Sequence, residues 1–266
     1  MCSVVNKQAV KWKAKDGFVC ALALIILSLI PDQILWFAYK NSPFCTNWLN
    51  AHSNLTQGGL LLIQSSLSLL TIFLFARTRS AQEFFVQVGI NHQPTLPGWF
   101  AAWIAMGIGF LALYGTNKQW IPSNQLSNDF VSQGGIAKSF FIIYGVLVAP
   151  FSEEVVRRGF LYRAFRGSYK PLSSTLIVLC VHAFFHWGLI SHSFYAFCCL
   201  LFVEALLCLI REWTGNVWNC VLCHVVYNAT QGLPYIVCLT GLILLLPQLS
   251  YHEWCKKRTR SQDGMK

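Results

Sequence analysis

Two long stretches without a charged residue constrain this chain more than any other feature. Residues 171–203 hold 33 consecutive positions without Asp, Glu, Lys or Arg, and residues 213–252 hold 40. A membrane-spanning helix needs about 20 apolar residues, so each stretch is long enough for two helices. Polar joints lie inside both stretches, at 191–193 (Ser-His-Ser) and at 231–234 (Gln-Gly-Leu-Pro). The sequence therefore predicts four spanning helices within these two stretches.

The composition agrees with a membrane protein. Hydrophobic residues make up 55% of the 266 positions and charged residues only 11%, against about 25% charged in an average soluble domain. Too few charges remain to cover an ordinary soluble enzyme, and a disordered chain, a coiled coil and a disulfide-rich secreted module are also excluded. Eight of the eleven cysteines fall within apolar stretches, so we expect free thiols rather than a disulfide framework.

The distribution of Lys and Arg predicts how the chain crosses the membrane. With the N-terminus in the cytoplasm, the inner segments hold 17 of the 20 basic residues and the outer segments hold Lys40, Lys118 and Lys138. Such an excess is typical of the cytoplasmic side. We therefore expect an all-α, polytopic membrane protein with about eight transmembrane helices and both termini cytoplasmic. The expected spans are 17–39, 58–76, 98–117, 136–156, 171–190, 194–210, 215–230 and 233–250.

Three regions are expected along the chain. Residues 1–135 would hold helices one to three, residues 136–232 a core of helices four to seven, and residues 233–266 the last helix and a basic tail. The net charge of +10 is explained by topology and by contact with anionic lipids, so we expect membrane lipids and no nucleic acid as partners. A bacterial inner membrane is the expected location, or the endoplasmic reticulum in a eukaryotic host.

Ionisable residues inside the expected spans are few. Each costs several kcal/mol in a membrane and marks a functional site by default. Counted from the nearest inner charge, Glu153, His186 and His224 lie at similar depths on three separate helices, about 20–24 Å from the inner ends. We expect them to converge in one polar cavity. The full set comprises Glu153, Glu154, Arg157, Arg158, His182, His186, Glu204 and His224, together with the amide of Asn228.

The spacing of these residues places them in pairs. Side chains four residues apart share one face of a helix, and three helices each carry such a pair. An isolated His or Asn in a membrane often only hydrogen-bonds a neighbouring helix, but three paired faces at one depth favour a functional site. The pairs are Glu154 with Arg158, His182 with His186, and His224 with Asn228.

The residue types in this set favour hydrolysis by an activated water. A carboxylate beside neutral imidazoles can act as a general base, and imidazole and carboxamide donors can stabilise an oxyanion. Glu153, His186 and His224 could instead bind zinc with one position open for water. No serine stands in a nucleophile setting, and no Gly-rich phosphate loop is present.

Two motifs in this set resemble a known family. Residues 153–158 have the form EExxxR followed by Gly, and residues 224–228 have the form HxxxN, with His186 between them on its own helix. This combination resembles the CAAX prenyl endopeptidase and bacteriocin-processing family of intramembrane proteases. The resemblance covers about residues 137–232, and the N-terminal third matches only as generic spans.

The resemblance implies a role for each motif residue. Glu153 would activate the water, and His186 would orient that water or stabilise the oxyanion. His224 and Asn228 would form the oxyanion site. Eukaryotic members of the family remove the last three residues from prenylated proteins, so a lipidated or membrane-embedded substrate entering from the cytosolic side is expected here. No cofactor is expected, with zinc as the alternative.

The chain departs from the family pattern at three positions. The second motif is usually FxxxH, but its first position here is His182, and Arg157 stands where an apolar residue is usual. Glu204 is an unexpected acid in the sixth span, which would either pair with an arginine or line the cavity. The resemblance implies that Glu154 and Arg158 brace the helix that carries them.

Three other interpretations compete with an intramembrane protease. Residues 220–224 fit CxxCH, the attachment motif of c-type haem, but they lie in an apolar stretch, so haem is not expected. Intramembrane Glu and His also serve proton-coupled transporters, although two related halves with broken helices are not found in the sequence. A non-catalytic immunity or scaffold protein could keep the same motifs.

Overall fold

The computed structural model describes residues 12–51, 53–76, 80–90, 94–115, 140, 143–187 and 194–232. Throughout this part of the chain the regular structure is helical, and no strand occurs among the residues described. The predicted all-α class is therefore confirmed. The expected eighth span, 233–250, lies outside the described residues.

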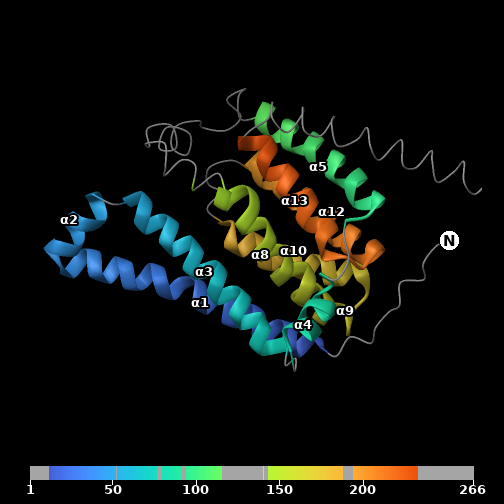
Figure 1. Ribbon diagram of the computed structural model, residues 1–266, viewed down its shortest axis with the longest axis horizontal. Coiled ribbons are helices and arrows are strands. Elements are labelled where there is room, and N and C mark those ends of the chain that lie inside the picture. The colour runs from blue at the N-terminus through green and yellow to red at the C-terminus, as the bar shows by residue number, and fades with distance from the viewer. Residues whose placement is uncertain are drawn as a thin grey trace, which may run out of the picture.

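The N-terminal helices form a long hairpin. Helix α1 (Ala14–Asn41) and helix α3 (Ser53–Ala76) lie side by side and are joined at one end by the short α2 (Pro43–Ala51), as Figure 1 shows. By length and composition, α1 and the Gly58–Ala76 part of α3 are sufficient to cross a membrane. Apolar side chains such as Phe37 are exposed along α1, which suits a lipid-facing surface.

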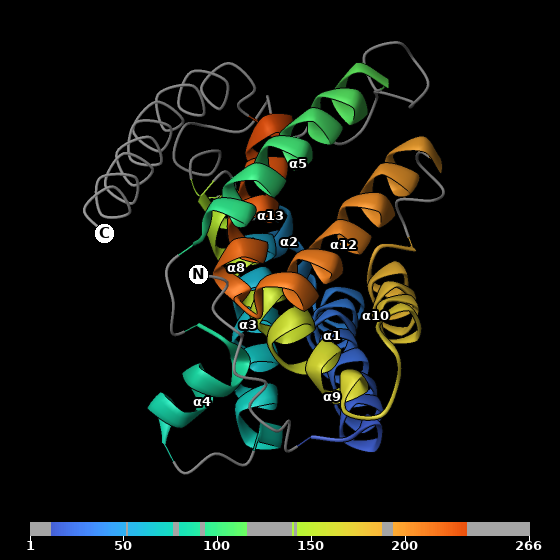
Figure 2. The same cartoon turned by 90° about the vertical axis from the view of Figure 1, so that its right-hand side faces the viewer.

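A second layer is built from α5 (Leu96–Gly115), α12 (Phe194–Thr214) and α13 (Val217–Gly232), as Figure 2 shows. Buried alanines of α5, including Ala101 and Ala105, let these helices approach closely because small side chains keep the backbones near one another. Helices α5 and α13 are also joined by hydrogen bonds at the N-terminal end of α5.

The side chain of Asn219 makes these hydrogen bonds. Its Oδ1 accepts a hydrogen bond from the backbone N–H of Thr95 at 2.8 Å, and its Nδ2 donates to Oγ1 of Thr95 at 3.0 Å. A buried amide of α13 thus supplies hydrogen-bond partners directly before the first turn of α5, where backbone N–H groups have none within the helix.

One continuous helix runs through the centre of the molecule from residue 143 to residue 166. Two stretches of it are π-helical, with wider turns than an α-helix, and such turns often occur at functional sites. The α-helical turns between them carry Glu153 and Glu154. The successive parts are η2 (Tyr144–Val148), α8 (Ala149–Glu154), η3 (Val155–Leu161) and α9 (Tyr162–Arg166).

This helix is longer than the span expected within it. The fourth span was expected at 136–156, and the helix continues to Arg166. Arg157 and Arg158 lie within this helix, and both are buried against carboxylates. Charges that are neutralised by a partner can remain inside a helical bundle.

Other boundaries also differ from those expected. Helix α10 (Pro171–Phe185) begins at the expected proline but ends five residues before the predicted 190. Helix α12 continues four residues beyond the predicted 210. A short helix that the sequence did not indicate, α4 (Ala81–Val88), is capped by Ser80 and stops at Gly89, whose φ of +87° favours glycine.

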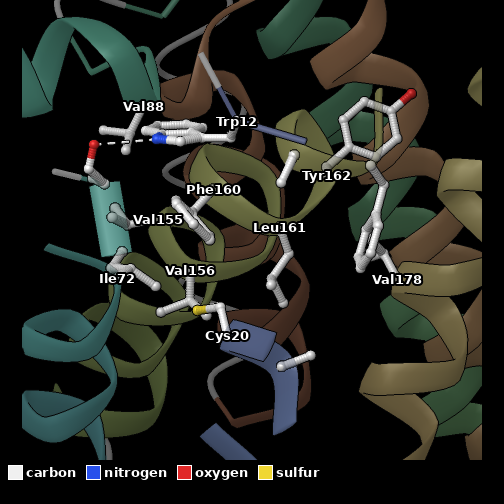
Figure 3. Packing of buried hydrophobic residues seen from close by; sticks show 14 of the residues in the cluster. Trp12, Cys20, Ile72, Val88, Val155, Val156, Phe160, Leu161, Tyr162 and Val178 are labelled. Carbon is white, nitrogen blue, oxygen red and sulfur yellow. Dashed lines mark hydrogen bonds between the residues drawn. The ribbon is translucent and has the colours of Figure 1, made fainter. Parts of the chain in front are cut away.

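Aromatic side chains contribute to the core between the central helix and the N-terminal helices. Trp12 packs on Phe160 with ring centroids 4.6 Å apart, and its indole N–H donates to the backbone oxygen of Ala76 at 3.2 Å, as Figure 3 shows. Val88 from α4 contacts the same helix beside Gly159, where an added Cβ would come within 3.0 Å of the valine. These contacts hold the helix that carries the motif glutamates.

Arg211 joins three elements through their backbones. The guanidinium of this buried side chain donates to the carbonyl oxygens of Val88 at 2.9 Å and Arg158 at 3.1 Å, and also to that of Gly215. Val88 ends α4, Arg158 lies in the central helix, and Gly215 stands in the turn between α12 and α13. One side chain therefore fixes three elements at the same end of the core.

We expect Arg211→Met to lower the free energy of unfolding by about 3 kcal/mol, because three carbonyl groups would lose their donors. The measurement is thermal unfolding of the purified protein in detergent. Arg166→Gln is the matched control. Its ion pair with Glu212, at 2.9 Å, is partly exposed, and such pairs contribute about 0–1 kcal/mol. Equal losses in the two variants would contradict the assignment.

Candidate functional site

Two adjacent glutamates of α8 differ sharply in their access to water. The side chain of Glu153 is 30% exposed, whereas that of Glu154 is 0% exposed. Successive residues of a helix point in different directions, so one carboxylate faces the site and the other faces the neighbouring helices. The two acids of the first motif therefore occupy different environments.

Glu154 belongs to a buried ionic bridge. Arg158 donates from Nη1 to Oε1 of Glu154 at 2.8 Å, which confirms the pairing predicted from the spacing. The same guanidinium donates from Nη2 to Oε2 of Glu204 at 2.6 Å and to the backbone oxygen of Glu204 at 2.9 Å. Arg158 thereby links the central helix to α12. Of the two expectations for Glu204, pairing with an arginine or lining the cavity, the structure shows the first.

Arg157 makes a second and looser set of ion pairs. Its Nη1 lies 3.0 Å from Oε2 of Glu153 and 3.6 Å from Oε1 of Glu204. The arginine that departs from the family pattern is therefore buried between two carboxylates. Its neighbour Glu153 stays partly open to solvent on the other side.

His224 lies between the two motif glutamates. Its Nδ1 is 2.9 Å from Oε1 of Glu154, and its Nε2 is 3.8 Å from Oε2 of Glu153. The predicted convergence of Glu153 and His224 is thus confirmed, although the two residues are 71 positions apart in the chain. The buried carboxylate orients the imidazole, and the other ring nitrogen faces the accessible carboxylate.

The two histidines of α10 stack on one another. Their ring centroids are 4.1 Å apart with planes 19° from parallel, and Nδ1 of His182 lies 3.2 Å from Oε2 of Glu204. His182 is 1% exposed. His186, the residue after the last helical turn, is only partly buried, and its ring nitrogen Nδ1 lies 3.2 Å from the backbone oxygen of His182.

Asn228 anchors α13 to the first π-helical segment. Its Nδ2 donates to the backbone oxygen of Gly145 at 2.8 Å. Asn228 is one turn from His224 on the same helix, as the spacing predicted, and it is partly buried. One amide hydrogen is used in this bond, and a carboxamide carries a second.

A polar contact that the sequence did not indicate joins α3 to the central helix. The hydroxyl of Tyr144 lies 2.6 Å from Oγ of Ser65 and donates to the backbone oxygen of Leu61 at 3.0 Å. Ser152, next to the first glutamate, donates to Oγ of Ser65 at 3.4 Å. Tyr and Ser are ordinary residues in spans, so only the folded structure reveals their alignment beside the site.

The donor atoms do not match the zinc site considered from sequence. That site required Glu153, His186 and His224, whereas the described residues whose ligand atoms lie within 4.8 Å of one another are Glu154, Glu204 and His224. Both carboxylates of this group accept hydrogen bonds from Arg158. A guanidinium already supplies the positive charge there, so the group does not fit a metal ion.

The conserved-domain comparison agrees with the resemblance drawn from the motifs. Residues 135–230 match the family model described as Rce1-like, a Type II CAAX prenyl endopeptidase. The family consists of membrane-embedded proteases. No curated protein and no solved structure matches the chain.

The two motif glutamates should differ in their effect on stability. We expect Glu154→Gln to lower the free energy of unfolding by about 3 kcal/mol, because the Arg158 guanidinium would lose one of its two buried anionic partners. Glu153→Gln should cost about 1 kcal/mol, since its own side chain is partly exposed and the buried Arg157 keeps Glu204 as an anionic neighbour at 3.6 Å. Thermal unfolding in detergent measures both, and a larger loss for Glu153→Gln would contradict the geometry.

Proposed function

We propose that this protein is an intramembrane endopeptidase that hydrolyses a peptide bond in a membrane-associated or lipidated substrate, as its Rce1-like segment implies. The reaction would use a water activated by Glu153, with His224 and Asn228 stabilising the oxyanion. His186 would orient the water. Glu154 and Arg158 would hold the first motif in place.

The difference in exposure between the two motif glutamates carries this proposal. A general base must reach its water, and Glu153 is the acid of the pair with an accessible carboxylate. Glu154 instead accepts from Arg158 and contacts His224. The resemblance implies that the first glutamate is the base. The greater exposure of Glu153 supports that assignment.

The position of His224 supports its part in the reaction. A carboxylate bound to one nitrogen of an imidazole fixes the orientation of the ring. With Nδ1–H donating to Glu154, Nε2 faces Glu153 across 3.8 Å, and the protonated ring of His224 would carry on Nε2 the hydrogen that it donates to the oxyanion. Asn228, one turn away, would add its free amide hydrogen as a second donor to the developing oxyanion.

The proposed mechanism uses no metal ion. Arg157 and Arg158 already lie against the three carboxylates of the site, and we derive no step through zinc. A zinc-dependent protease is kept as an alternative outcome of the activity test below. A non-catalytic scaffold and a proton-coupled transporter are the other outcomes.

We also propose the membrane topology inferred from the sequence. Eight spans with both termini cytoplasmic would place the C-terminal end of the central helix on the cytosolic side of the membrane. The basic residues at that end, including Lys13, Lys15 and Lys170, are exposed and are suited to contact anionic headgroups.

The activity is tested with a quenched, lipidated peptide and protein purified in detergent. We expect wild type to cleave the peptide, and Glu153→Gln and His224→Ala to lose at least about 100-fold in kcat, in the range of lost general-base and oxyanion groups. Activity should persist after exhaustive chelation. Loss on chelation with recovery on added zinc would instead establish the metalloprotease, and equal activity of Glu153→Gln and wild type would contradict the mechanism.

The topology is tested with reporter fusions. A fluorescent protein that folds only in the cytoplasm should be active when it is fused to either terminus. Alkaline phosphatase, which is active only outside the cytoplasm, should be active when it is inserted near Lys118 and inactive near Lys170. Phosphatase activity at a terminus would overturn the predicted orientation.

A further inference from the structure

Three residues that the motif pattern does not explain meet in the folded protein. Arg157 lies in the central helix, His182 in α10 and Glu204 in α12, and their exposed fractions are 6%, 1% and 0%. Nothing in their spacing along the chain connects them, because 22 to 25 residues separate each from the next. Their meeting places three charged or titratable groups in one buried cluster.

The carboxylate of Glu204 contacts both other residues. Its Oε1 lies 3.6 Å from Nη1 of Arg157, and its Oε2 lies 3.2 Å from Nδ1 of His182. Oε2 also accepts the hydrogen bond from Arg158. Glu204 is therefore the shared partner of side chains from two neighbouring helices.

Each of these partners contacts a different residue of the proposed active site. Arg157 forms an ion pair with Glu153 at 3.0 Å. His182 stacks on His186 at 4.1 Å. The path from the proposed base to the proposed water-orienting histidine thus runs from Glu153 through Arg157, Glu204 and His182 to His186.

We propose that Arg157, His182 and Glu204 form one positioning unit, which fixes the side chain of Glu153 relative to that of His186 across three helices. The inference rests on the proposed function, because it concerns how that site is held. The three residues are positioning residues, since they act through Glu153 and His186. His182 has this role rather than that of the working histidine, because it is enclosed and faces Glu204.

The contacts within the unit depend on one another. Oε1 of Glu204, Nη1 of Arg157 and Nδ1 of His182 are buried and make no hydrogen bond within the described part of the chain. Removing one member therefore leaves each member that contacted it buried with one polar partner fewer, although Glu204 keeps Arg158 and Arg157 keeps Glu153. When all three members are replaced, no member is left buried without its partners in the unit. The loss of stability in the triple variant should therefore be smaller than the sum of the three single losses.

The test compares Glu204→Gln with a triple variant that also carries Arg157→Met and His182→Phe. Gln keeps an acceptor for Arg158 while it removes the negative charge. With the lipidated peptide, we expect Glu204→Gln to lower kcat about tenfold or more with little change in KM, because misplacing groups that act in the transition state lowers kcat. The triple variant removes the whole unit and should lower kcat about as much as Glu204→Gln alone does, because residues that act together do not add their losses.

Glu212→Gln is the matched control. Glu212 lies on the same helix as Glu204, two turns away, but it pairs with Arg166 outside the site. We expect its kcat and KM to equal those of wild type. A loss of kcat in this variant as large as that of Glu204→Gln would mean that any change of charge on α12 disturbs the enzyme, which would overturn the inference.

Two results separate the failure of this inference from failure of the proposed function. Cleavage that requires Glu153 but tolerates Glu204→Gln would overturn the positioning unit alone. Cleavage indifferent to Glu153→Gln would contradict the proposed function.

Thermal unfolding then tests the unit without a substrate. Single, double and triple variants form mutant cycles. If the triple variant loses less free energy of unfolding than the sum of the three single losses, the result supports the unit. Additive losses would overturn it.

Discussion

The buried guanidinium of Arg158 is the constraint on which the core depends. A cation without access to water must be compensated by anions and by hydrogen bonds, and Arg158 has both, from Glu154 on its own helix and from the side chain and backbone of Glu204 on α12. Glu154 in turn contacts His224 on α13. One buried charge thereby fixes the positions of the central helix, α12 and α13 relative to one another.

The balance of charge at the site gives Glu153 its distinct character. Three carboxylates face two guanidiniums, so one formal negative charge remains unless an imidazole carries a proton. Glu154 and Glu204 are enclosed, and Glu153 is the member of the trio that reaches solvent. An ionised carboxylate is least costly where water can solvate it. The site therefore places its surplus charge where the proposed reaction needs a base.

Much of this site could be predicted from the sequence, because helical periodicity is local. The pairing of Glu154 with Arg158 follows from spacing alone, and the common depth of Glu153 and His224 follows from counting residues along the helices. Which arginine pairs with Glu204 could not be predicted, since Arg158 is 46 positions away.

Arg211 shows another kind of tie between distant segments. Its three partners are backbone carbonyls, and every amino acid supplies one. These three hydrogen bonds therefore require no particular side chain at residues 88, 158 and 215, whereas they do require an arginine at position 211. Pairs of positions that change together across related sequences would reveal the contacts of Glu204 with Arg157 and His182. Such paired changes would not reveal the contact of Arg211 with α4, because its partner there is a backbone carbonyl.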